Sequence, residues 1–292
     1  MLDLVIRNGQ VITPQGAGLW DVGVRGEQIA VIAAPGTLPT DAARVIDAAG
    51  LIVSPGGVEP HAHLAHGIMS HPEEPAITLG PEDDTRGMAC GGTTTHIDFA
   101  YVRPGSDIQP VIEQRASRWK GNSYVDYAFH LTLAGALPIR VFDQIGEAIQ
   151  AGHPSFKVFT TNVLPPHPKR SGNRIDFGRI HFAMEKVAKA GGIMVVHGED
   201  EDLVQFNYER FREEGRMDGS NLHLVHTKLS ELLAFRRTVA LAKASGAGVY
   251  FVHVSAREGV ETVAEARAQG LPVYGETLHQ YACFNAEYYK TP

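Results

Sequence analysis

Hydrophobic and polar residues alternate in short runs over the first part of the chain, up to about residue 54. Runs such as DLVIRNG, QVITPQGAG and RVIDAAGLIVSPG are rich in β-branched residues and contain glycine, proline or asparagine near their ends. Short alternating runs bounded by turn residues are typical of β-strands. The pattern therefore predicts a small all-β unit over residues 1–54.

The pattern changes after Gly56, where short apolar runs alternate with longer amphipathic stretches. Ile180–Ala190 and Leu229–Ser245 have helical spacing and a glycine just beyond each end, which predicts helices. The predicted strands are Val58–His63, Thr93–Phe99, Tyr124–Leu131, Ser155–Thr160, Gly192–His197, Val249–Val254 and Leu271–Glu276. Strands that alternate with helices are typical of a parallel α/β sheet. We expect a (β/α)8 TIM-type barrel over residues 55–292 without its last strand, although a doubly wound open sheet gives the same order of elements.

Composition narrows the class of protein. The 292 residues are 43% hydrophobic and 20% charged, with a net charge of −7, and no cluster of lysine and arginine suits a nucleic-acid surface. The two cysteines, Cys90 and Cys283, lie far apart, which argues against disulfides and against a cysteine zinc site. No apolar stretch reaches the roughly 18 residues of a membrane helix. We therefore expect a cytoplasmic protein that binds neither nucleic acid nor a membrane.

Histidines stand at the ends of several predicted strands. His61 and His63 are two residues apart, so both side chains point to the same face of an extended strand. His197 and His253 end, or nearly end, two later strands. Barrel enzymes place their chemistry at the C-terminal ends of strands, so these four imidazoles are candidate metal ligands. Taken singly, His197 or His253 is better explained as a hydrogen-bonded histidine of the core.

Lys157 lies in the middle of the predicted strand SFKVF. Burial disfavours the ammonium form and lowers the pKa of a lysine, and a neutral amine can add carbon dioxide to form a carbamate. A carbamate offers two oxygens and one negative charge, which suits a bridge between two cations. The alternative is a lysine whose ammonium group reaches solvent at the strand end.

Further motifs run through the whole chain in order. They are DLVIRNG at 3–9, PGGVEPHAHL at 55–64, GGTTTHIDF at 91–99, SFKVF at 155–159, VVHGED at 195–200, FVHVS at 251–255 and LPVYGET at 271–277. Together they resemble the dihydropyrimidinase and D-hydantoinase branch of the cyclic amidohydrolases, in the amidohydrolase superfamily. The resemblance implies a metal-dependent hydrolase that opens a cyclic amide or imide with a hydroxide bridging two metal ions. It also implies a homo-oligomer, either a dimer or a tetramer.

The resemblance also implies a ligand set. In this family the residues at the positions of His61 and His63 bind one metal ion, and those at His197 and His253 bind the other. A carboxylated lysine at the position of Lys157 bridges the two. The implied cofactors are two divalent ions, Zn²⁺ in the first place and Mn²⁺ as an alternative.

The chain departs from the family pattern at several positions. The family's ligating aspartate follows the eighth strand and would lie beyond residue 292, so we expect the C-terminal part of the fold to be missing. That part would include strands completing a small β-sandwich with residues 1–54. Asn162 stands where the family has a tyrosine, and His66 and His71 occupy a loop that is otherwise apolar. We expect Asn162 to contact the substrate and its oxyanion, and His66 and His71 to contact the substrate. We therefore expect the protein to be a poor hydantoinase that prefers a more polar cyclic amide or imide.

Other functions of the same fold stay open. An allantoinase-type hydrolase shares the metal ligands, and a non-catalytic relative could use the fold as an assembly module. Such modules lose the ligands that this chain keeps. Dihydroorotase chemistry is disfavoured because no arginine follows His63 before Arg86 in the sequence. Glu199 and Asp200 are interpreted as acids at a helix N-terminus, and Asp98 as either a structural residue or one that orients a histidine.

Overall fold

The structure is a computed structural model that describes residues 1–68 and 76–290. It divides into two compact units, Met1–Gly57 and Val58–Pro292. Each unit is described by itself below. Among the described residues, no helix combines the length and the apolar character needed to cross a membrane.

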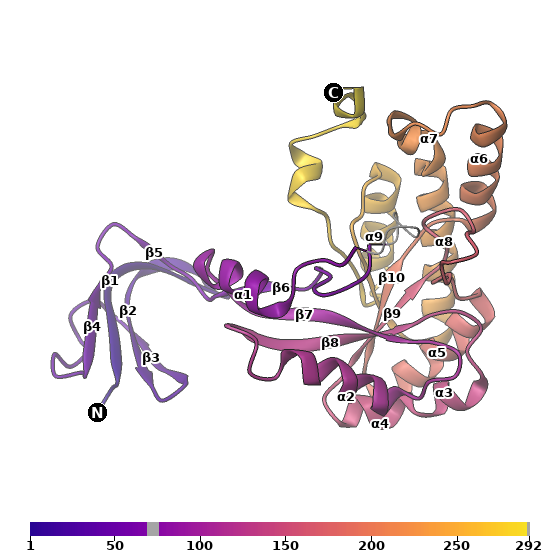
Figure 1. Ribbon diagram of the computed structural model, residues 1–292. Coiled ribbons are helices and arrows are strands. Elements are labelled where there is room, and N and C mark those ends of the chain that lie inside the picture. The colour runs from indigo at the N-terminus through magenta and orange to yellow at the C-terminus, as the bar shows by residue number, and fades with distance from the viewer. Residues whose placement is uncertain (69–75, 291–292) are drawn as a thin grey trace. The chain divides into compact units, whose positions relative to one another are not determined.

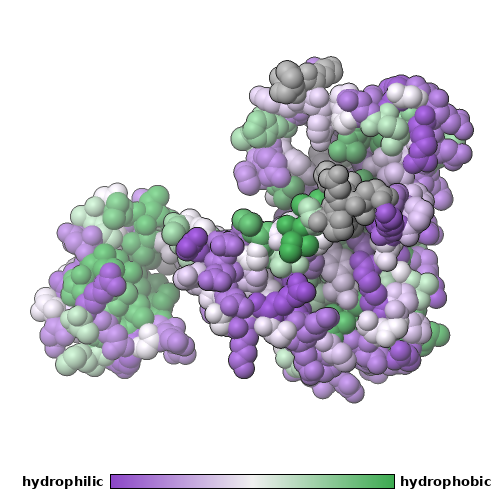
Figure 2. All heavy atoms as spheres, in the orientation of Figure 1, coloured by the Kyte–Doolittle hydropathy of each residue, from purple (hydrophilic) through white to green (hydrophobic). Residues whose placement is uncertain are grey.

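The first unit is a single mixed sheet in the part of the chain that the structure describes. Its strands are β1 (Leu4–Thr13), β2 (Gly16–Arg25), β3 (Gln28–Ala33), β4 (Arg44–Asp47) and β5 (Ile52–Val53). Strand β1 pairs antiparallel with β2 and parallel with β4 and β5, and β3 pairs antiparallel with β2. Leu2 and Val5 are buried, whereas Leu19, Ile29 and Ile52 are more than half exposed. Figure 2 shows such hydrophobic side chains gathered on the surface of this unit.

The second unit is built on a seven-stranded sheet. Its strands are β6 (Gly57–Glu59), β7 (Thr93–Val102), β8 (Asp126–Leu133), β9 (Ser155–Phe159), β10 (Ile193–His197), β11 (Gly248–Phe251) and β12 (Val273–Gly275). They are neighbours in sequence order, and the pairings from β7 to β12 are all parallel. The parallel α/β prediction is confirmed. A doubly wound sheet reverses its strand order, so this sequential order does not fit that alternative.

Helices connect the strands of this sheet. They are α1 (Pro81–Cys90), α2 (Ile108–Trp119), α3 (Ile139–Asp143), α4 (Ile145–Gln150), α5 (Phe177–Ala190), α6 (Glu201–Glu213), α7 (Leu222–Val225), α8 (Lys228–Ser245) and α9 (Arg257–Ala268). The described residues also include the short 3-10 helices η1 (Gly219–Asn221), η2 (His279–Ala282) and η3 (Ala286–Lys290). Figure 1 shows α2 and α5 running beside the strands they connect.

The sheet curls strongly, because its two edge strands approach each other at their C-terminal ends. Strands β6 and β12 are the first and last of the seven. His61 follows β6, Glu276 follows β12, and His61 Nδ1 lies 2.8 Å from Glu276 Oε1. A flat sheet of seven strands would hold its edges about 28 Å apart, since neighbouring strands are about 4.7 Å apart. The curl therefore brings the C-terminal ends of distant strands into one site.

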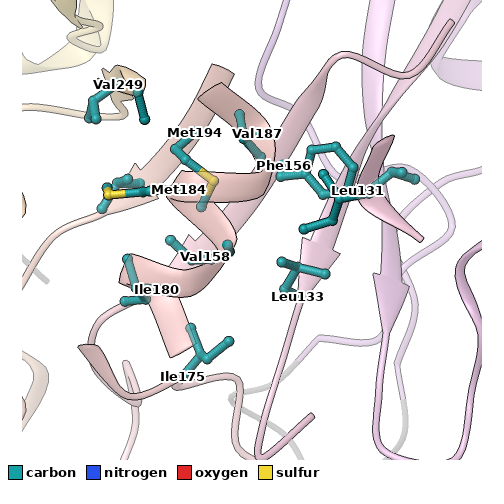
Figure 3. Packing of buried hydrophobic residues seen from close by; sticks show 14 of the residues in the cluster. Leu131, Leu133, Phe156, Val158, Ile175, Ile180, Met184, Val187, Met194 and Val249 are labelled. Atoms are coloured by element: carbon teal, nitrogen blue, oxygen red, sulfur yellow. The ribbon is translucent and has the colours of Figure 1, made fainter. Parts of the chain in front are cut away.

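The alternation of side chains along β9 determines which residues face that site. Phe156 and Val158 are fully buried, and Figure 3 shows them with Met184 and Val187 of α5 in the hydrophobic layer between sheet and helix. Neighbouring residues on a strand point to opposite faces. Lys157 therefore points to the inner, concave face of the sheet rather than toward α5.

Substitution of Gly192, in the turn before β10, tests how closely β10 packs against the helices. A Cβ on Gly192 would lie 2.6 Å from Pro154 O and 2.7 Å from Ile149 Cδ1. Gly192→Ala should therefore lower the free energy of unfolding by about 1–3 kcal/mol, as overpacking does, measured by denaturant titration. Gly146→Ala in α4 is the matched control, because nothing lies within 4 Å of its added Cβ. Equal stabilities of the two variants would contradict the packing of β10 against α4 and α5.

Candidate metal centre

The structure brings together the four proposed histidine ligands, at the C-terminal ends of their strands, and Lys157, in the middle of its strand. His61 and His63 follow β6, Lys157 lies on β9, His197 ends β10, and His253 follows β11. The ring centres of His61 and His253 are 5.3 Å apart, and those of His197 and His253 are 4.6 Å apart. The ring centres of His61 and His63 are 5.8 Å apart. Residues separated by up to 192 positions in sequence thus share one rim.

Lys157 is completely buried, with 0% of its surface exposed. Among the described residues, its Nζ atom has no hydrogen-bond partner. The centres of the Phe159 and Phe99 rings lie 5.0 and 5.6 Å from Nζ. Burial lowers the pKa of Lys157 to about 7, against a smaller opposing effect of Glu276. Near neutral pH a large fraction of this amine is therefore unprotonated and nucleophilic.

A carboxylate fixes the orientation of His61. Glu276 accepts hydrogen bonds from His61 Nδ1 at 2.8 Å and from the Tyr250 hydroxyl at 3.0 Å. Burial alone would raise the pKa of Glu276, but these hydrogen bonds lower it, so the group is an ionised acceptor. Because a carboxylate cannot donate, the proton of neutral His61 lies on Nδ1. Its Nε2 lone pair is left for a ligand, as in many metal sites.

A second carboxylate orients His197 in the same way. Glu199 Oε2 lies 2.7 Å from His197 Nε2, and Oε1 lies 2.7 Å from His226 Nδ1. Burial opposes ionisation of Glu199, but both histidines stabilise the anion and lower its pKa to about 2. The proton of neutral His197 therefore lies on Nε2, and its Nδ1 lone pair faces His253 Nε2 at 2.9 Å. Two imidazole nitrogens thus meet at one point of the rim.

His253 adopts a strained backbone, with φ of 42°. Such a conformation costs about 1–3 kcal/mol in a residue other than glycine and persists where its surroundings hold it. Glu231 of α8 accepts hydrogen bonds from Ser255 N at 3.0 Å, Ser255 Oγ at 2.7 Å and Ala256 N at 3.0 Å. Glu276 Oε1 lies 3.3 Å from His253 N. Two carboxylates therefore hold the segment that carries this histidine.

The residues present suit a pair of divalent cations. In the described part of the chain, no group of three or more His, Cys, Asp and Glu side chains is arranged to hold an ion. Two histidines from one end of the sheet and two from the other supply only two such ligands each. The third ligand of each set would be Lys157, whose buried and unpartnered Nζ is the atom that carboxylation would convert into a two-oxygen anion. Imidazole and carboxylate-type oxygen together suit Zn²⁺.

The residues proposed for the substrate are placed differently. Asn162 Nδ2 donates to Glu201 Oε1 at 3.0 Å, and Asn162 Oδ1 accepts from the backbone of Asn173 and Arg174 at 3.1 and 3.2 Å. The amide therefore ties the 162–174 loop to α6, and its role toward an oxyanion stays a prediction. His71 lies outside the described residues.

His66 lies beside the proposed metal ligands rather than among them. Its ring centre is 5.3 Å from that of His63, and its Nε2 is 2.7 Å from Arg115 Nη2. Arg115 comes from α2 and also pairs with Asp98. From sequence, dihydroorotase chemistry was disfavoured because no arginine follows His63 before Arg86, but Arg115 of α2 lies in space beside His66 and Leu64. A contact of His66 with substrate stays a prediction.

From the sequence, Asp200 was interpreted correctly, Glu199 was misinterpreted and Glu276 was given no role. Asp200 is the N-cap of α6, where its side chain accepts from Leu203 N at 3.0 Å, as expected. Glu199 instead bridges His197 and His226, so its interpretation as a helix-terminal acid was wrong. Glu276 was assigned to a strand end without a role. Its position right after an apolar strand, at the same edge as the histidines, was the available signal.

A cavity of about 480 Å³ opens beside His197 and His253. Its walls include Leu222, Phe235, Tyr281 and other apolar or aromatic residues, with Glu199 and His226 among the polar ones. Cavities that bind small molecules measure about 300–1,000 Å³ and are mostly apolar with a few polar groups. This one has the size and composition for a small ligand next to the candidate metal centre.

Comparison with known proteins supports the family resemblance. The chain is 31% identical over 290 residues to the D-hydantoinase of Geobacillus stearothermophilus, which covers 99% of this chain and 58% of that protein. It is 30% identical over 289 residues to an allantoinase of Escherichia coli O9:H4 (strain HS), with 99% and 61% covered. The chain is therefore similar over nearly its whole length to proteins named D-hydantoinase and allantoinase. No protein-family model matches it.

Solved structures named hydantoinase or dihydropyrimidinase agree with this similarity. The structure of a dihydropyrimidinase from Brevibacillus agri NCHU1002 superimposes with a TM-score of 0.88 at 29% identity, over 99% of this chain and 60% of that one. The parallel α/β sheet is therefore that of the hydantoinase structures. The chain spans about three fifths of the length of the relatives it matches.

The burial of Lys157 leads to a chemical prediction. With a pKa of about 7, the reactive neutral amine should be scarce at pH 6 and dominant at pH 8. Protein held in ¹³C-bicarbonate at pH 8 with Zn²⁺ should therefore show one carbamate carbon signal by NMR, weaker at pH 6. Lys157→Gln should lack the signal, whereas Lys186→Gln, which removes a surface lysine paired with Asp143, should keep it. A signal that survives Lys157→Gln would contradict the assignment.

Proposed function

We propose that this protein is a metal-dependent hydrolase that opens the ring of a cyclic amide or imide. The observation that carries the proposal is the buried, unpartnered Lys157 amine beside four histidines from three strand ends. A lysine in that position gains a partner if it carries a carbamate bound to cations. Relatives named D-hydantoinase and allantoinase act as independent support.

The proposal includes the fold in which the site works. We infer that the curled sheet is most of a (β/α)8 barrel, because strand order is sequential and the two edges meet at Glu276 and His61. We also infer that the first unit, predicted over residues 1–54, is part of a β-sandwich. The exposed apolar residues Leu19, Ile29 and Ile52 suit a sheet face that a second layer covers.

In the proposed site, His61 and His63 hold one divalent ion, His197 and His253 hold the other, and carboxylated Lys157 bridges them. When bound, a pair of ions such as Zn²⁺, or Mn²⁺, supplies Lewis acidity toward the ring carbonyl and lowers the pKa of water. The chain's own residues then have positioning roles. Glu276 and Glu199 hold the protons of His61 and His197 on the nitrogens that face away from the rim.

The cavity beside His197 and His253 is the proposed place for the substrate. The cavity has a volume of about 480 Å³, and the aromatic and aliphatic residues of its wall exclude water from the reacting ring. Glu199 and His226 stand at this wall and are bonded to each other at 2.7 Å. Allantoinase-type hydrolysis is the second candidate, favoured by the 30% identity to an allantoinase. A purely structural assembly module is disfavoured because the five proposed ligands are present and adjacent.

A hydrolysis screen tests the function. The protein loaded with Zn²⁺ should open at least one ring among hydantoins, dihydropyrimidines, cyclic imides and allantoin. Asn162 and His66 in place of the family's residues lead us to expect unsubstituted or apolar hydantoins to be poor substrates, since one lost oxyanion donor costs about 10²–10³ in turnover. Lys157→Ala should reduce kcat to background and remove most bound zinc, with Lys186→Ala as the control. Wild-type kcat and undiminished zinc content in Lys157→Ala would refute the bridging role.

A further inference from the structure

A second cavity, of about 220 Å³, lies beside the strand end that carries His61 and His63. Its polar lining residues can all donate hydrogen bonds, and its other lining residues are aromatic or aliphatic. The lining residues are His66, Phe99, Ala100, Tyr101, Val111, Gln114, Arg115 and Arg118. No carboxylate is among them. A cavity lined in this way favours a ligand with acceptor oxygens.

Arg115 is fixed in place by a buried ion pair. Asp98 has 0% of its surface exposed and accepts hydrogen bonds from Arg115 Nε at 2.7 Å and from Trp119 Nε1 at 3.0 Å. Arg115 Nη2 also donates to Asp98 and to Leu64 O. Within the described residues, the hydrogen bonds of Arg115 all come from Nε and Nη2. The guanidinium is therefore held rigidly while Nη1 stays available to a ligand.

His66 and Tyr101 contribute further donors. Arg115 Nη2 lies 2.7 Å from His66 Nε2, and because an arginine can only donate, Nε2 accepts and Nδ1 carries the proton. The longer 3.2 Å contact of Nε2 with Asp98 is consistent with simple proximity. In the described residues the Tyr101 hydroxyl makes no hydrogen bond, and burial raises its pKa to about 12. Tyr101 therefore keeps its proton and can donate it.

The charge around this cavity is also unbalanced. Asp98 neutralises Arg115 at the back of the cavity, and Asp98 Oδ2 accepts hydrogen bonds from both Arg115 and Trp119. Arg118 is exposed and, among the described residues, has no side-chain partner. The positive charge of Arg118 is therefore left for a ligand. Arg115 Nη1, His66 Nδ1 and the Tyr101 hydroxyl are the donors that remain beside it. A carboxylate, with two oxygens in one plane and one negative charge, matches a guanidinium edge and neighbouring hydroxyl and imidazole donors.

We propose that the cavity between the end of β7 and α2 binds a carboxylate group, held by Arg115, His66, Tyr101 and Arg118. Its position indicates how the carboxylate relates to the reaction, because the His66 ring centre is 5.3 Å from that of the proposed metal ligand His63. The carboxylate is either a substituent of the ring substrate or a separate small anion. The first of these rests on the proposed function.

Binding of sodium acetate to the zinc-loaded protein tests the site. Acetamide has nearly the same shape without the charge and is the control ligand. We expect acetate, but not acetamide, to bind in the millimolar range by NMR line broadening of ¹³C-acetate. Arg118→Gln and Tyr101→Phe should each weaken this binding about 10-fold, the size of a lost hydrogen bond to a charged group. Both variants leave the buried Arg115–Asp98 pair intact.

Arg86→Gln is the matched control, because Arg86 is an exposed arginine of α1 outside the cavity lining. It should bind acetate like the unchanged protein. Acetate held only by the zinc ions would be insensitive to Arg118→Gln and Tyr101→Phe, and that result would overturn the proposal. Equal binding of acetamide and acetate would also overturn it.

A pair of ring compounds separates the two sources of the carboxylate. Hydantoin-5-acetic acid and hydantoin-5-acetamide differ in charge but hardly in shape. If the ring carries the carboxylate, kcat/KM should favour the acid about 10-fold, and Arg118→Gln should abolish that preference. If a separate anion binds, the two rings should react equally while acetate binding keeps its dependence on Arg118 and Tyr101. If no ring is hydrolysed, the proposed function fails, and the acetate measurement still decides the site.

Discussion

The structure of the candidate site depends on the burial of one amine. Lys157 has no exposed surface and no partner for Nζ among the described residues, although an unsatisfied buried polar group costs about 1–3 kcal/mol. The pairing of β9 with β8 and β10 determines which face of the sheet the side chain lies on. Phe156 and Val158 secure that pairing from the outer face. The fold therefore keeps an amine buried without a hydrogen-bond partner, and a modification or a ligand would relieve this cost.

Three carboxylates organise the histidines around this amine. Glu276 connects the two edges of the curled sheet through His61, Glu199 orients His197, and Glu231 holds the segment after the strained His253. Each acid is bonded to a histidine or to the backbone beside one, so proton positions and backbone strain are set together. The same groups that shape the end of the sheet therefore also prepare nitrogen lone pairs for a ligand.

Much of this arrangement was visible in the sequence. The alternation of apolar strands and amphipathic helices predicted the parallel α/β sheet, and the histidines at strand ends predicted which residues gather at one rim. Local spacing carries that information because side-chain direction follows directly from strand periodicity. The order of strands in the sheet, which decides against a doubly wound topology, needed the structure.

Contacts between segments far apart in sequence could not be predicted in the same way. Arg115 of α2 lies 2.7 Å from His66, which is 49 positions away in sequence. No motif near His63 predicted this contact. Asn162 was interpreted from the family pattern alone, yet its amide is bonded to Glu201 and to the backbone of Asn173. Such pairings depend on how helices pack against the sheet, which a single sequence does not encode locally.

The most direct test of the central claim is a crystal structure of the protein with Zn²⁺ and bicarbonate, with anomalous diffraction recorded at the zinc absorption edge. The account predicts two anomalous peaks, one at His61 and His63 and one at His197 and His253, joined by additional density on Lys157 Nζ. Zinc–oxygen distances of about 2.0–2.2 Å to that density are expected. A bare Lys157 amine with no zinc within reach of these histidines would contradict the account.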